Sequence, residues 1–127
     1  MAIELRTKET PIVEKTKELC QTIVDQPQFG EMVKAIDSFL GNSHARGLYE
    51  EVSDLQERLV AKQNRGETLQ DAEISEFEAK RGRLLDDETA RAYLDARQQI
   101  QEVQQTISQY VSQTFDLGRV PLPEEIS

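Results

Sequence analysis

The four prolines of this 127-residue chain restrict its fold more than any other feature. They stand at Pro11, Pro27, Pro121 and Pro123, so no proline lies between residues 28 and 120. Proline is tolerated in the first turn of a helix but breaks a helix interior. No segment alternates apolar and polar residues as a strand would, and no Asn-Gly or Asp-Gly turn occurs. The sequence therefore predicts an all-α protein.

Apolar residues recur three and four residues apart through most of the chain, as on one face of a helix. This spacing predicts helices over residues 11–25, 27–40, 43–65 and 88–115, and a capping-box-like segment at residues 68–71 predicts the start of one more helix. The last helix has the most regular stripe, a heptad-like seam of Tyr93, Ala96, Ile100, Val103, Ile107 and Tyr110. A narrow seam buries little alone and needs a partner helix.

We expect the helix over 43–65 to be the internal partner of this seam. The helix that starts at residues 68–71 would then lie in the turn between these two helices or extend one of them. The predicted fold is two short N-terminal helices followed by a long antiparallel helical hairpin. The whole chain, residues 1–127, is expected to form a single domain with extended tails at 1–9 and 116–127.

Composition limits the classes of partner. Hydrophobic residues make up 37% of the chain and the net charge is −9. The small apolar share suits elongated helices or a core completed by a second chain, so we expect a homo-oligomer, a dimer or larger. The negative charge disfavours autonomous binding to nucleic acid. The single cysteine cannot form an internal disulfide, and the N-terminus has no apolar run typical of a signal peptide. No apolar stretch is long enough to span a membrane, so we expect a cytoplasmic protein.

Residues with catalytic or ligating chemistry are few. Cys20 lies on the apolar face of its helix and is interpreted as a small buried hydrophobe rather than a nucleophile or cluster ligand. His44 is the only histidine, and no metal-ligand spacing accompanies it. The acidic runs at 50–54 and 86–88 are typical of a solvated face or a helix start. We expect no catalytic residue, no metal, no cofactor and no enzymatic activity.

One basic segment stands out, formed by Lys80, Arg81 and Arg83. It could contact RNA, but no aromatic residue is interleaved for stacking on bases. Pairing with carboxylates such as Glu67, Glu76 or Glu78 is the preferred interpretation.

Several phrases of the sequence together resemble a known family. They are KTKELCQTIVDQPQF at 15–29, FLGNSHARGLYEEV at 39–52, the segment KQNRGETL…EISEFE within 59–85, and LGRVP at 117–121. The chain resembles the YlbF/YmcA family of small bacterial helical proteins over residues 10–121. The resemblance rests on helix order and local phrases and includes no catalytic signature.

The resemblance implies a cytoplasmic, all-α, oligomeric protein with a long helical hairpin. The best-known members act with the protein YaaT as a complex that governs the endoribonuclease RNase Y, and thereby mRNA maturation, competence, sporulation and biofilm formation. Some of these complexes carry iron–sulfur clusters. This chain departs from that pattern, because its tail has no cysteine and Cys20 alone cannot ligate a cluster.

The leading hypothesis is a non-catalytic oligomeric adaptor that acts by protein–protein contact, on itself and on a regulatory partner related to RNase Y complexes. The broadest apolar stripe supplies the expected contact residues in addition to the seam: Phe29, Met32, Val33, Ile36 and Phe39. The alternative for this stripe is that all five are core. The alternative functions are a coiled-coil chaperone or structural spacer, and a weak RNA-binding protein that uses residues 80–83.

Overall fold

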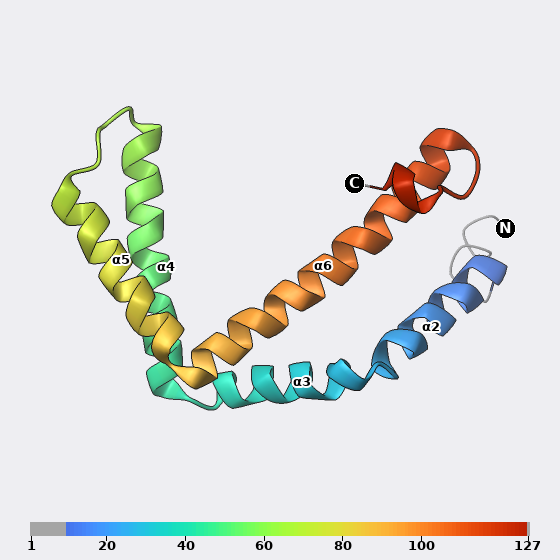
Figure 1. Ribbon diagram of the computed structural model, residues 1–127, viewed down its shortest axis with the longest axis horizontal. Coiled ribbons are helices and arrows are strands. Elements are labelled where there is room, and N and C mark those ends of the chain that lie inside the picture. The colour runs from blue at the N-terminus through green and yellow to red at the C-terminus, as the bar shows by residue number, and fades with distance from the viewer. Residues whose placement is uncertain (1–9, 127) are drawn as a thin grey trace, which may run out of the picture. The chain divides into compact units, whose positions relative to one another are not determined.

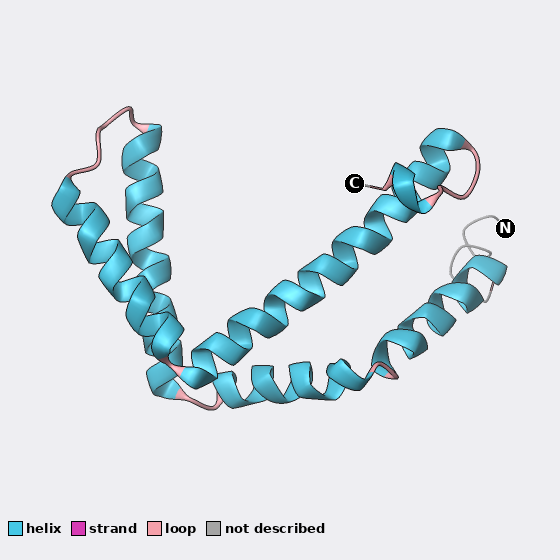
Figure 2. Cartoon of the chain, viewed as in Figure 1, coloured by secondary structure: helices cyan, strands magenta, loops and turns pink. Residues whose placement is uncertain are grey.

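The computed structural model describes residues 10–126, and they are helical with no strand among them (Figure 2). The prediction of an all-α protein is therefore confirmed. The elements in chain order are α2 (Pro11–Val24), α3 (Pro27–Leu40), α4 (Ser43–Asn64), α5 (Asp71–Asp86), α6 (Glu88–Leu117) and a short 3-10 helix, η1 (Pro123–Glu125). The N-terminal tail predicted at residues 1–9 lies outside the described residues.

Short polar side chains begin three of these helices. Thr10 accepts a hydrogen bond from the Val13 N–H at 3.2 Å, just before Pro11 opens α2. Asn42 does the same for α4 through the Ala45 N–H at 3.0 Å. The Asp87 carboxylate accepts from the Ala90 N–H at 2.9 Å and begins α6. Each contact satisfies one backbone donor that the first turn of a helix leaves free.

The start of α5 lies within residues 68–71, the segment in which the sequence predicts a capping box. The helix begins at Asp71, with Gln70 as its cap, and the Gln70 N–H donates to Glu73 Oε1 at 2.8 Å. Lys62, near the end of α4, also donates to Glu73 Oε1, at 2.7 Å. The Glu73 carboxylate accepts hydrogen bonds from the Gln70 backbone and from Lys62 of α4. It therefore fixes Gln70 as the residue that caps α5.

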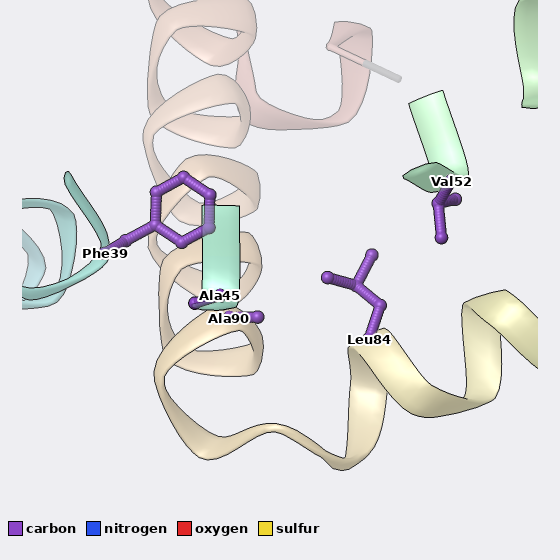
Figure 3. Close-up of a cluster of buried hydrophobic side chains, with 5 residues drawn as sticks. All are labelled: Phe39, Ala45, Val52, Leu84 and Ala90. Atoms are coloured by element: carbon purple, nitrogen blue, oxygen red, sulfur yellow. The ribbon is translucent and has the colours of Figure 1, made fainter. Parts of the chain in front are cut away.

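The described residues divide into two units, with the boundary between Lys34 and Ala35, within α3. In the second unit α4 and α5 lie side by side as a hairpin, and α6 starts at the base of this hairpin (Figure 1). The core cluster draws on α3, α4, α5 and α6 and consists of Phe39, Ala45, Val52, Leu84 and Ala90 (Figure 3). Leu48, Tyr49, Phe77, Tyr93 and Leu94 pack against it.

A helical hairpin is present, but its members differ from those expected. The sequence suggested α4 with α6, whereas the most extensive packing is between α4 and α5. Two features of α5 explain this pairing: Leu84 is buried in the core, and Glu73 pairs with Lys62 of α4. The α6 helix contributes buried residues only at Ala90 and Ala96, in its first half.

The C-terminal tail also differs from the extended segment predicted for residues 116–127. Helix α6 continues to Leu117, and Gly118 ends it with φ +73°, a left-handed conformation that glycine adopts at little cost. The tail then turns back: Pro121 is buried, and the Arg119 guanidinium donates to both carboxylate oxygens of Glu125, at 2.8 and 2.9 Å. This bidentate ion pair stabilises the turn between Gly118 and Glu125.

The ion pair predicts a pH response of the tail. The hydrogen bond from Arg119, with a second from the Leu122 N–H, lowers the pKa of Glu125 from 4.5 to about 2. A lowered pKa in the folded state means that the contribution of this carboxylate to tail order is complete above pH 4.5 and is lost as the pH falls through about 2. In an NMR titration we expect the Glu125 carboxyl to titrate near 2. In Arg119→Gln it should titrate closer to 4.5, and an unchanged midpoint would contradict the pairing.

Candidate interaction surfaces

The first unit presents an apolar helix face to solvent. None of the residues of α2 is buried, and Ile12, Leu19 and Val24 are all exposed, Ile12 to 79%. Cys20 lies in the same helix and is exposed, which corrects its interpretation as a buried hydrophobe. The apolar spacing places Cys20 on one face of α2 but does not show whether another helix covers that face.

The stripe predicted on α3 is divided between two environments. Phe29, Met32 and Ile36 are partly buried, and Val33 is exposed. Phe39 is only 4% exposed and belongs to the core cluster of the second unit. The structure thus places Phe39 in the core and leaves the other four available for contact.

Phe39 is held by an aromatic cluster that also involves α4 and α6. Its ring stacks on Tyr93 at 3.8 Å between centroids and meets Tyr49 edge-on at 5.8 Å. The Arg97 guanidinium donates to the Tyr49 hydroxyl at 3.0 Å and lies 5.7 Å from the Tyr93 ring centroid. Such ring and cation–π contacts stabilise beyond the area they bury. The nearby phenols of Tyr93 and Tyr49 raise the pKa of Arg97.

The predicted seam of α6 changes environment along its length. Tyr93 is partly buried and Ala96 is buried, where α6 meets the hairpin. Further along, Val103 is 43% exposed, and the remaining seam residues, Ile100, Ile107 and Tyr110, are partly buried. Past Ala96 the seam therefore has no hairpin helix to pack against.

Three large exposed apolar residues on α6 were absent from the predicted set: Val111, Phe115 and Leu117, which is 41% exposed. Val111 is 52% exposed and Phe115 is 85% exposed. With Val103 and Ile107 they form a series spaced by four residues, which places all of them on one face of the helix. The predicted heptad seam did not include Val111 and Phe115, because its positions alternate in steps of three and four residues.

The basic segment of α5 lies among carboxylates. Lys80 Nζ is 3.6 Å from Glu76 Oε1, one of the pairings predicted from the sequence, and Arg81 and Arg83 are exposed. At the tip of the hairpin, Arg65 pairs with Glu67 at 2.8 Å and Lys62 with Glu73 at 2.7 Å. The hydrogen bond from Lys62 lowers the pKa of Glu73. The acidic neighbours reduce the positive potential that a phosphate backbone would need.

Metal-binding chemistry has little support in the part of the chain described. Residues 10–126 contain no group of three or more His, Cys, Asp or Glu side chains placed to hold a metal ion. His44 is exposed, and its Nε2 lies 3.9 Å from Asp87 Oδ2, whose carboxylate already caps α6. An iron–sulfur cluster, held by several thiolates, does not fit a chain whose single cysteine is Cys20.

A groove of about 430 Å³ lies between α4, α5 and α6. Apolar side chains such as Phe77 and Leu94 line it together with Arg81 and Asp95.

No helix among residues 10–126 has the length and apolarity needed to cross a membrane.

Over residues 10–126 the protein is all-α, and its amphipathic helices carry exposed apolar residues. A family model described as "Control of competence regulator ComK, YlbF/YmcA" matches residues 12–116. The chain belongs to this YlbF/YmcA family, as its sequence suggested, and the family is a regulatory one. Neither the comparison with curated proteins nor that with solved structures gave a match.

Proposed function

We propose that this protein is a non-catalytic adaptor of the bacterial cytoplasm that regulates a partner by direct contact and forms oligomers. The observation that carries the proposal is the apolar face left uncovered on α2 and α3, where Ile12, Leu19, Val24 and Val33 are exposed. Exposed apolar patches of this kind mark surfaces for protein partners. Membership of a family of competence regulators supports a regulatory rather than a metabolic role.

The proposed partner is a ribonuclease complex of the RNase Y type, through which the protein would affect mRNA processing and developmental control. Direct binding to RNA is not part of the proposal. The chain carries a net charge of −9, and Lys62, Arg65 and Lys80 lie against carboxylates. A partner protein therefore provides the contact with RNA.

Affinity purification from the native host tests this function. The full chain, tagged and expressed from its own locus, should retrieve a ribonuclease or a defined regulatory protein at constant ratio. Recovery of unfolded clients alone would contradict the adaptor and favour a chaperone or spacer. Recovery of RNA that falls steeply with added salt would favour direct RNA binding.

One substitution on α3 should abolish the retrieval while leaving the fold intact. Val33→Glu places a charge on the exposed apolar stripe, and burying an unpaired carboxylate in an apolar contact is costly. We expect recovery of the partner to fall by roughly tenfold or more, which corresponds to about 1.4 kcal/mol. Ser38→Glu adds the same charge to the opposite side of α3 and should retain the partner. Equal loss in both variants would contradict a contact through this stripe.

A further inference from the structure

The groove where α4, α5 and α6 meet has a volume of about 430 Å³, and each helix contributes one side to it. The lining residues of α4 run from Tyr49 to Gln56, and those of α5 from Phe77 to Leu85. At 1.5 Å per residue the lined segment of α4 is about 10 Å long, which corresponds to two helical turns. The groove therefore has the length of a short helical segment.

The most buried residues that line the groove are apolar. Val52 is 8% exposed and Leu84 is 4% exposed, and their side chains point toward one another (Figure 3). Phe77, Leu85 and Leu94 are partly buried and line the same groove. Apolar side chains that an occupant inserts here leave water for a packed apolar surface, which favours binding.

Two opposite charges also line the groove, Arg81 on α5 and Asp95 on α6, and both residues are exposed. Within residues 10–126 neither side chain forms an ion pair or a hydrogen bond, in contrast to Lys80, which pairs with Glu76. Both charges are available to an occupant, Arg81 to a carboxylate and Asp95 to an ammonium or guanidinium group. The complementary occupant therefore carries both signs of charge beside its apolar residues.

The helical walls favour an α-helix as the occupant. The backbone groups of α4, α5 and α6 are hydrogen-bonded within their own helices, so they offer no edge to which an extended chain could add as a strand. An α-helix satisfies its own backbone and needs only side-chain contacts. Sites for small molecules enclose most of the ligand, whereas Gln56 and Gln98 on this groove are exposed, as are its two charged residues.

We propose that this groove binds an amphipathic α-helix of a partner protein. Two turns of that helix present apolar residues to Phe77 and Leu94, an acidic residue to Arg81 and a basic residue to Asp95. The groove shares no residue with the stripe on α3, so the inference goes beyond the proposed function and does not rest on it. Occupation of both surfaces would let one chain hold two partner segments.

Selection from displayed helices tests the proposal with the purified full-length chain. The probes are a phage library of amphipathic helices, from which we expect sequences with apolar residues three or four positions apart and an acidic and a basic residue beside them. A synthetic peptide of the selected sequence, measured by fluorescence anisotropy, should bind Arg81→Glu at least about tenfold more weakly than the wild-type chain, because two carboxylates then meet. Replacing the acidic residue of the peptide by lysine should restore binding to Arg81→Glu.

Arg83→Glu is the matched control, because Arg83 is exposed on α5, two residues beyond Arg81 and outside the groove. It changes the net charge equally and should bind the peptide as the wild-type chain does. Failure to select any helix, or equal weakening by Arg81→Glu and Arg83→Glu, would overturn the proposal.

Light scattering distinguishes a second copy of the chain from a partner helix as the occupant. We expect the wild-type chain and Arg81→Glu to have the same mass in the absence of peptide. A lower mass for the variant would identify a second copy in the groove and overturn the proposal. Val33→Glu, which tests the proposed function, should leave peptide binding unchanged, so the two ideas can fail separately.

Discussion

Phe39→Ala is expected to lower the free energy of unfolding by about 3–5 kcal/mol, the range for removing a buried phenylalanine. The ring is 4% exposed, stacks on Tyr93 at 3.8 Å and meets Tyr49 edge-on. Its loss would leave a cavity where the end of α3 joins α4 and α6. Urea-induced loss of helical circular dichroism, at equal protein concentrations, measures the effect.

Phe29→Ala provides the matched control for this prediction. It removes the same side chain from the same helix, but Phe29 is only partly buried and lies outside the core cluster. We expect a loss below about 1 kcal/mol, within the range of substitutions away from a packed core. Similar losses for the two variants would contradict the assignment of Phe39 to the core and of Phe29 to a contact surface.

Ala90→Leu is expected to destabilise the protein by about 1–3 kcal/mol through overpacking. Ala90 in the first turn of α6 and Ala45 in the first turn of α4 are both fully buried in the same cluster (Figure 3). A larger side chain at Ala90 would displace its neighbours in that cluster. The same urea titration measures the effect.

Ala92→Leu places the same new side chain two residues further along α6, where Ala92 is exposed. Leucine and alanine differ little in helix propensity, so we expect a change within about 0.5 kcal/mol. If Ala92→Leu were as destabilising as Ala90→Leu, the cost would come from the helix itself rather than from the packed junction.

Features that depend on interactions between residues close in the sequence were predicted well. The bounds of α3 were predicted to the residue, and those of α2, α4 and α6 to within two residues. Caps such as Asn42 and Asp87 act on backbone groups three residues away, so they are visible in the sequence. The start of α5 lies within the predicted segment 68–71, and the choice of Gln70 as its cap depends on Glu73, which Lys62 of α4 also holds.

The surfaces were less predictable, because an apolar stripe does not show which residues another helix will cover. Cys20 and Phe39 both lie on apolar stripes, yet Cys20 is exposed and Phe39 is buried. Val111 and Phe115 were missed on α6, although their spacing of four from Val103 and Ile107 was a usable signal.

The sequence by itself determined the all-α class, the helix limits and the family, since proline positions, caps and helical periodicity act within a few residues. Only the tertiary structure decided that α4 pairs with α5, that Phe39 enters the core and that the tail turns back from Gly118. These outcomes depend on contacts between residues distant in the chain. An amphipathic helix requires a partner for its apolar face but does not specify which partner, so packing makes the choice.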